Sequence, residues 1–235
     1  MTVAVIGPAT SDRVELADGR AAVRPGGTPL YAARALRRTG APCVAIETGH
    51  LHSWVRHTGS ATEQHLGAMP EPLSPARARG LLPRLAACDW VLLGGQTAGD
   101  FPPETVEVLA GAGHSVLLDG QGLARGSRGG PVHLGAIDPA AYAAATVLKL
   151  NEAEAAAAGK LEPVPELLLT HGSTGASITA GGSTTEVAGN GVPFADPTGA
   201  GDSLAALYCL GRALGNDPAD ACRFAIGEVE RIYRT

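Results

Sequence analysis

Short apolar runs recur along the chain, and each is followed by a turn and then by a stretch of helical character. The runs are rich in Val, Ile and Leu, as is typical of strands buried on both faces of a parallel sheet. They lie at residues 3–6, 43–46, 90–93, 115–118, 146–150 and 167–170. Helices are predicted between them, at residues 30–38, 75–87, 103–110 and 152–158. The alternation predicts βαβ units, and hence a three-layer α/β fold with a mainly parallel central sheet.

Two segments interrupt this alternation. Residues 13–16 and 21–24 flank Ala17-Asp18-Gly19, and an Asp-Gly turn between extended runs predicts a β-hairpin. Residues 50–74 are rich in Gly, His, Ser and Pro and lack clear periodicity. This stretch is either an ordered loop or carries one more strand near residues 62–66. We therefore expect a single domain over residues 1–235, with a small, reduced β lid. The lid is a hairpin within residues 13–25, and part of residues 57–67 is an optional extension.

Composition and charge exclude several classes of function. The 235 residues carry a net charge of −5, have no Lys/Arg cluster and contain 4% aromatic residues, so we expect no nucleic-acid partner. No apolar run approaches the ~20 residues of a membrane-spanning helix, and the N-terminus does not resemble a signal peptide. The four cysteines show no C-x-x-C spacing and are expected to be free thiols in a reducing compartment. These features predict a cytoplasmic protein without a membrane partner.

The segment at residues 195–203, Ala-Asp-Pro-Thr-Gly-Ala-Gly-Asp-Ser, carries the most chemistry. Glycines allow the backbone to approach a ligand closely, and the apolar stretch that follows predicts a helix. Unpaired N–H groups at a helix start, aided by the helix dipole, form an anion site. Asp202 beside such a site could take a proton from an attacking hydroxyl. From spacing alone, the alternative that Asp202 only caps the helix stands level with this hypothesis.

The stretch Asp196-Pro197-Thr198-Gly199-Ala200-Gly201-Asp202 closely resembles the C-terminal signature of the PfkB/ribokinase family of carbohydrate kinases. The resemblance implies a ribokinase-like fold and an ATP-dependent kinase. It also implies that Asp202 is the catalytic base, and that the backbone amides of Gly199, Ala200 and Gly201 form the anion hole.

Other parts of the family pattern occur in the same order. Around the acceptor, the resemblance implies substrate contacts from Asp12, Gly26 and Gly27, the last two resembling the paired glycines of the N-terminal signature. Asn151 and Glu154 resemble the N-x-x-E element that acts on Mg²⁺ and phosphate, often through water. The turn that contains Thr170, Gly172 and Gly175 resembles the T-x-G-x-x-G turn beside the nucleotide. The stretch from Asp119 to Arg125 is similar to D-x-Q-G-x-x-R of a branch with myo-inositol kinase-like proteins, which adds Gln121 and Arg125 as substrate-binding candidates.

Two departures from the family keep alternatives open. Tyr31 stands where the family usually has an Asn that contacts the sugar, so it joins the candidate substrate residues and indicates a different substrate shape. The chain is also shorter than most members, which is why a reduced lid, or a lid completed by a second subunit in a homodimer, is considered. We expect ATP and Mg²⁺ as cofactors and a sugar or cyclitol as acceptor. A nucleoside acceptor and a non-catalytic sugar or nucleotide sensor are the alternatives, whereas a dinucleotide-binding oxidoreductase lacks its G-x-G-x-x-G turn.

Overall fold

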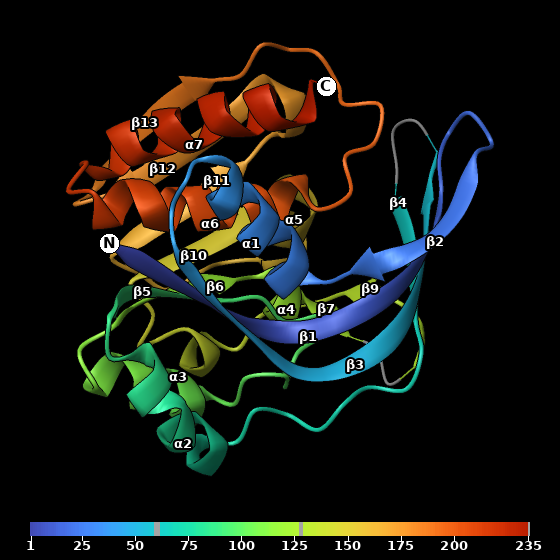
Figure 1. The fold of residues 1–235 in the computed structure, drawn as a ribbon. Coiled ribbons are helices and arrows are strands. Elements are labelled where there is room, and N and C mark those ends of the chain that lie inside the picture. Colours follow the sequence, from blue (N-terminus) through green and yellow to red (C-terminus); the bar gives the residue numbers. More distant parts are fainter. Residues whose placement is uncertain (59–61, 127–128, 235) are drawn as a thin grey trace.

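The computed structural model describes residues 1–58, 62–126 and 129–234 and has one large sheet at its centre (Figure 1). In the described part of the chain, eleven strands form this sheet, and six neighbouring strands at its centre are joined by parallel pairings. The order is β13-β12-β11-β10-β6-β5-β1-β3-β4-β8, with β2 paired to β1. The strands are β1 (Thr2–Glu15), β2 (Ala21–Gly26), β3 (Cys43–His57), β4 (Thr62–Leu66), β5 (Cys88–Leu93), β6 (Ser115–Asp119), β8 (Gly130–Pro131), β10 (Val147–Asn151), β11 (Glu166–Thr170), β12 (Gly175–Ala180) and β13 (Ser183–Ala188).

Helices cover both faces of the sheet, which gives the predicted three layers (Figure 1). Helices α1 (Thr28–Arg38), α6 (Ala200–Ala213) and α7 (Pro218–Tyr233) lie on one face, and α2 (Pro75–Leu85) and α3 (Pro103–Gly111) lie on the other. Strand β1 supplies alternate side chains to the two cores, Val3 and Val5 to the first and Ala4 and Ile6 to the second. Burial on both faces explains why these strands have continuous apolar sequences. Shorter elements complete the chain: α4 (Gln121–Ala124), β7 (Arg125–Gly126), β9 (His133–Leu134), α5 (Glu152–Ala158) and two 3-10 turns, η1 (Pro139–Ala141) and η2 (Gly172–Thr174).

The lid is an extension of the central strands beyond the core (Figure 1). Strand β1 changes register against β3 between Gly7 and Ala9, and from Thr10 onward it pairs with β2 as well. Strand β3 continues alongside and pairs with β4. Of the two interpretations offered for residues 50–74, the structure therefore has the strand at Thr62–Leu66. The lid consists of parts of β1, β2, β3 and β4, more than the hairpin at residues 13–25.

The lid part of β3 was not predicted from the sequence, because two of its residues do not follow the alternation of apolar buried and polar exposed side chains. Burial alternates along this strand, since Leu51, Ser53 and Val55 are buried whereas His52 and Arg56 are exposed. A serine on the buried side and Trp54 on the other side remove the expected apolar–polar alternation. No helix among the described residues is both long and apolar enough to cross a bilayer.

Candidate active site

The turn before α6 has a backbone that requires glycine. Gly199 is the N-cap of α6 with φ 81°, in the left-handed region that favours glycine. A Cβ atom at Gly199 would also lie 2.2 Å from Cγ of Tyr31. The helix therefore starts at Ala200, whose N–H donates to the carbonyl oxygen of Pro197 at 3.0 Å, and the next N–H groups of the first turn are those that a helix presents at its N-terminus. This places the three predicted anion-hole residues together at the positive end of the α6 dipole.

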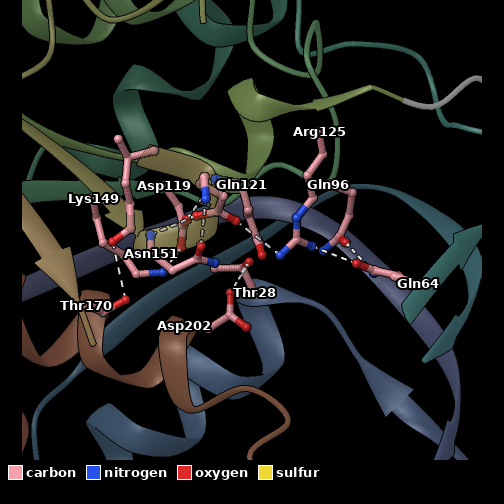
Figure 2. Close-up of polar contacts among 12 residues, drawn as sticks. Thr28, Gln64, Gln96, Asp119, Gln121, Arg125, Lys149, Asn151, Thr170 and Asp202 are labelled. Atoms are coloured by element: carbon pink, nitrogen blue, oxygen red, sulfur yellow. Dashed lines mark hydrogen bonds and ion pairs between the residues drawn. The ribbon is translucent and has the colours of Figure 1, made fainter. Parts of the chain in front are cut away.

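Asp202 lies in the first turn of α6, half-buried, and its Oδ1 accepts a hydrogen bond of 2.5 Å from Oγ1 of Thr28. Thr28 directly follows Gly26 and Gly27, so the two predicted signature segments meet at this carboxylate (Figure 2). Burial, together with the charge of Asp119, raises the pKa of Asp202 to about 6, against the lowering effect of Thr28 and Lys149. A carboxylate with a pKa near the working pH suits a general base. The capping alternative loses support, because the N-cap is Gly199 and no side chain caps this helix.

Lys149 is a site residue that the sequence analysis missed. It lies on β10 inside the predicted apolar run, its side chain is 7% exposed, and its Nζ lies 2.8 Å from Oδ2 of Asp119 (Figure 2). A Cβ atom at Gly201 would lie 3.2 Å from this Nζ, so the ammonium group is beside the first turn of α6. Burial alone would lower the pKa of Lys149, but Asp119 and Glu154 outweigh it and raise the pKa. The lysine therefore stays charged next to the anion hole.

Arg125 connects the lid to the base of the site. Its Nη1 donates to Oε1 of Gln64 on β4 at 2.7 Å, and its Nη2 lies 3.3 Å from Oε1 of Glu154 at the start of α5. Gln64 in turn donates to Gln96 at 3.3 Å (Figure 2). The side chain of Gln121, the other candidate from this stretch, makes no hydrogen bond to another described residue, while its backbone N–H donates to Oδ1 of Asp119 at 3.2 Å. Arg125 therefore lies at the candidate site, where its guanidinium group contacts both Gln64 of the lid and Glu154 of α5.

Asn151 and Glu154 form a reciprocal capping box at the start of α5. Oδ1 of Asn151 accepts from the N–H of Glu154 at 2.9 Å, and Oε2 of Glu154 accepts from the N–H of Asn151 at 3.0 Å. With its other oxygen on Arg125, Glu154 has no carboxylate oxygen without a partner. No group of three His, Cys, Asp or Glu side chains in the described ranges could hold a metal ion. The donor set is compatible with a magnesium ion only if the ion keeps water ligands and is bound mainly by donor phosphates, as Mg²⁺ often is; the role of Asn151 and Glu154 through water stays a prediction.

The predicted acceptor residues lie together at the base of the lid. Asp12 is 5% exposed, and a Cβ atom at Gly26 would lie 1.7 Å from Oδ2 of Asp12. Gly27 has φ 92°, and a side chain there would meet the carbonyl oxygen of Pro8 at 2.4 Å. The Tyr31 hydroxyl lies 3.5 Å from Oδ2 of Asp12. Burial and the charge of Asp12 raise the pKa of Tyr31, so the phenol stays neutral there.

Two buried hydroxyl groups beside Asp12 have no hydrogen-bond partner within the part of the chain that the structure describes. Thr10 precedes Asp12 by two residues on β1, and Ser53 is paired with Asp12 on the neighbouring strand β3. Oγ1 of Thr10 and Oγ of Ser53 are both inaccessible and unpaired. Unsatisfied buried hydroxyls are rare in native proteins and call for an explanation. Neither residue was predicted from the sequence. Ser53 comes to lie beside Asp12 only through the register of β3 against β1, and the sequence does not reveal that register.

The candidate nucleotide residues lie at the opposite end of the site. Thr170 ends β11 and donates from Oγ1 to the carbonyl of Leu150 at 3.3 Å, and Gly172 and Gly175 take positive φ angles of 61° and 124° around the turn η2. The cavity next to this turn has a volume of about 30 Å³ and is closed on its far side by α7. That volume is about the share of one water molecule in the liquid. Its lining residues include Gly172, Gly175, Asn190, Phe194, Ile226 and Glu230.

Comparisons with known proteins concern one segment of the sequence and the fold. A model of the pfkB family carbohydrate kinases matches residues 138–227, which include the Asp196–Asp202 signature. This match bears out the predicted resemblance to the PfkB carbohydrate kinases over that segment. A search of curated proteins finds no match.

Among solved structures, the chain is similar to a pyrophosphate-dependent kinase of the ribokinase family complexed with a pyrophosphate analogue and myo-inositol. The two share 18% identity and a TM-score of 0.79, over 99% of this chain and 95% of that one. It is also similar to Arabidopsis thaliana ribokinase complexed with ribose and ATP, with 16% identity and a TM-score of 0.71 over 99% and 92% of the two chains. A Burkholderia thailandensis nucleoside kinase in complex with inosine has 18% identity and a TM-score of 0.72, over 97% and 89%. The ribokinase-like fold is thereby confirmed.

Proposed function

We propose that this protein transfers a terminal phosphoryl group from a polyphosphate donor to a hydroxyl group of a small polyol. The observation that carries the proposal is the position of Asp202. Its carboxylate is half-buried, has a pKa of about 6, and lies at the N-terminus of α6 beside the Lys149 ammonium group. A carboxylate beside an anion site is unfavourable for binding alone, but it is required where a hydroxyl must lose a proton as it attacks phosphorus.

In the proposed reaction, the acceptor oxygen forms a bond to the terminal phosphorus while the bridging P–O bond breaks. The acceptor proton moves to Asp202, and the bridging oxygen leaves with the rest of the donor. The amides of Gly199, Ala200 and Gly201 stabilise charge on the transferring group, as preorganised donors do in other phosphoryl transfers. Lys149 adds a positive charge next to them. Magnesium, when bound, would neutralise donor phosphate charge, with Asn151 and Glu154 orienting its water ligands.

A polyol acceptor is supported by the polar groups under the lid. Asp12 offers a carboxylate, and Thr10 and Ser53 offer two hydroxyls without partners. A molecule that carries several hydroxyl groups can donate to one of these side chains and accept from another, so it would satisfy all of them. The similarity to a structure with myo-inositol bound favours a cyclitol within this class. A nucleoside acceptor stays the alternative, on the similarity to the structure with inosine.

ATP is the donor that the PfkB resemblance implies, with pyrophosphate as the second candidate. One observation favours pyrophosphate. The cavity beside Gly172 and Gly175, where the family resemblance would place a nucleotide, has a volume of about 30 Å³, whereas pockets that hold drug-sized ligands are about ten times larger. An adenine ring would need α7 or the segment after β13 to move, whereas pyrophosphate needs only the cationic groups at the anion hole. The similarity to a pyrophosphate-dependent kinase points the same way.

The decisive experiment follows phosphorus directly. The protein is incubated with Mg-ATP or Mg-pyrophosphate and a panel of cyclitols, sugars and nucleosides, and phosphomonoester products are detected by ³¹P NMR. Asp202→Asn serves as the control, because it keeps the side-chain shape and an acceptor for Thr28 but cannot take the proton. We expect one donor to give product, and we expect the variant to lower kcat by roughly 10²–10⁴-fold. Ligand binding without product from either donor would replace the kinase with the sensor alternative.

A further inference from the structure

Two strands of the lid contact the same turn ahead of the anion hole. Arg24 lies near the end of β2, and its Nη1 is 2.5 Å from Oδ2 of Asp196. His57 is the last residue of β3, and its Nε2 is 3.1 Å from Oγ1 of Thr198. Asp196 also accepts a hydrogen bond of 3.0 Å from the N–H of Thr198. The next residue after this turn is Gly199, the N-cap of the helix that carries the proposed base.

The turn itself is open on part of its surface. Behind it lies a cavity of about 310 Å³ between α1 and α7, with Asp196 and Thr198 on its wall. Ala195 and Pro197 are exposed. On the side of α7, the Tyr233 hydroxyl donates a long hydrogen bond of 3.4 Å to the Thr198 carbonyl, and the Tyr233 ring stacks on Phe194, which precedes the turn. The contacts from the lid hold the other side of the turn, through Asp196 and Thr198.

The ion pair in this contact persists through the working pH range. Burial would raise the pKa of Asp196, but the hydrogen bonds from Arg24 and Thr198 outweigh burial and hold the pKa at about 2. The Asp196 side chain is 31% exposed and that of Arg24 35% exposed, so solvent screens part of the attraction. The ion pair therefore holds Asp196 at a fixed distance from Arg24 while the lid is in place. Because both side chains are partly exposed to solvent, the pair can separate when the lid moves.

We propose that Arg24 and His57 are positioning residues that couple the lid to the anion hole. With the lid strands in place, the contacts Arg24–Asp196 and His57–Thr198 hold the turn that leads into the N-terminus of α6, and so fix where the first-turn amides of this helix meet an anion. When the lid lifts, both contacts break and the amides lose this arrangement. Closure over an acceptor therefore completes the phosphoryl-binding groups, and opening weakens the hold on the products. The inference rests on the proposed kinase function and adds a device that links acceptor binding to donor binding.

The test compares Arg24→Ala with Arg56→Ala. Arg56 neighbours His57 on β3, and its partner is Glu15 within the lid, at 3.3 Å, so the control removes a lid ion pair that does not reach the turn. Amide hydrogen exchange is measured across residues 195–202, along with kcat and both KM values. We expect faster exchange in this segment and a loss of kcat of roughly ten- to a hundredfold in Arg24→Ala, but neither change in Arg56→Ala. Arg24→Lys should restore part of kcat, and Arg24→Ala/Asp196→Ala should be no worse than Arg24→Ala.

Two outcomes would overturn the coupling. A lower melting temperature in Arg24→Ala, with wild-type kcat and wild-type exchange at residues 195–202, would mean that Arg24 only stabilises the fold. Equal effects of Arg24→Ala and Arg56→Ala would mean that general loosening of the lid is responsible. The exchange readout needs no turnover, so it decides the coupling even if the wild-type protein phosphorylates nothing in the panel, a result that would count against the proposed function alone.

Discussion

The pair formed by Lys149 and Asp119 allows the stability and the catalytic role of one residue to be separated. The two side chains are 7% and 1% exposed and lie 2.8 Å apart. Lys149→Met keeps most of the aliphatic stem but leaves Asp119 buried without its cation. Breaking a buried pair from one side costs about 3–5 kcal/mol, out of a typical total of about 5–15 kcal/mol. For a chain of this length, such a loss lowers the melting temperature by roughly 6–20 °C.

The double variant Lys149→Met/Asp119→Asn removes both charges at once. The asparagine keeps an oxygen that can accept from the N–H of Gln121, now 3.2 Å from Oδ1 of Asp119. The remaining cost is mainly that of an amide group left without a partner, about 1–3 kcal/mol. We therefore expect the double variant to melt at a higher temperature than Lys149→Met, although it differs from the wild type at two positions.

For kcat, unlike the melting temperature, we expect no recovery in the double variant. Both variants lack the ammonium group beside Gly201, so both should lose kcat by about 10²–10³-fold, the usual cost of one preorganised group at a site of developing charge. The assay is product formation with the acceptor and donor identified by ³¹P NMR, at a temperature where circular dichroism shows both variants folded. Near wild-type kcat in the double variant would refute the reasoning, because Lys149 would then serve only to neutralise Asp119.

Two further predictions concern the base and the acceptor. The pKa of Asp202, raised to about 6, predicts that kcat increases with pH through about 6. In Asp119→Asn the increase of kcat should occur at lower pH, because the variant lacks a negative charge that raises the pKa of Asp202. An unchanged pH profile of kcat would count against Asp202 as the general base. Since folding raises the pKa of Asp202 above its ordinary 3.8, its contribution to stability is full below that value and is lost as pH rises through about 6. Thermal melts at pH 8 should accordingly find Asp202→Asn more stable than the wild type. Separately, Thr10→Val and Ser53→Ala should each raise the acceptor KM about 5- to 10-fold, the equivalent of one hydrogen bond, and leave the donor KM unchanged; an unchanged acceptor KM in both would exclude these hydroxyls from the acceptor site.

The core strands could be predicted from the sequence because the pattern that identifies each one lies within its own few residues. Strands covered on both faces need apolar side chains at every position, and that pattern is visible without knowledge of the neighbours. The lid strands are covered on one face only, and the buried face of β3 includes Ser53. A polar residue is tolerated there if it serves a ligand, so the strand that contributes Ser53 to the proposed acceptor site is also one with a weak strand signal. The proposed role of this strand and its missed prediction would then have the same origin.

The candidate site was predicted where one short motif holds the chemistry and missed where the chemistry depends on strand order. Asp202 and its glycines lie within seven residues of sequence, whereas the contact of Lys149 with Asp119 exists because β10 lies next to β6. These two residues are direct partners in the register of that strand pair. A lysine within a strand buried on both faces is itself a signal, since a buried cation needs a counter-charge. The sequence could therefore have indicated that Lys149 has an acidic partner, and only the topology identifies that partner as the aspartate at the end of β6. The same reasoning applies to Arg24, whose contact with Asp196 joins residues far apart in the chain and depends on how the lid folds over the core.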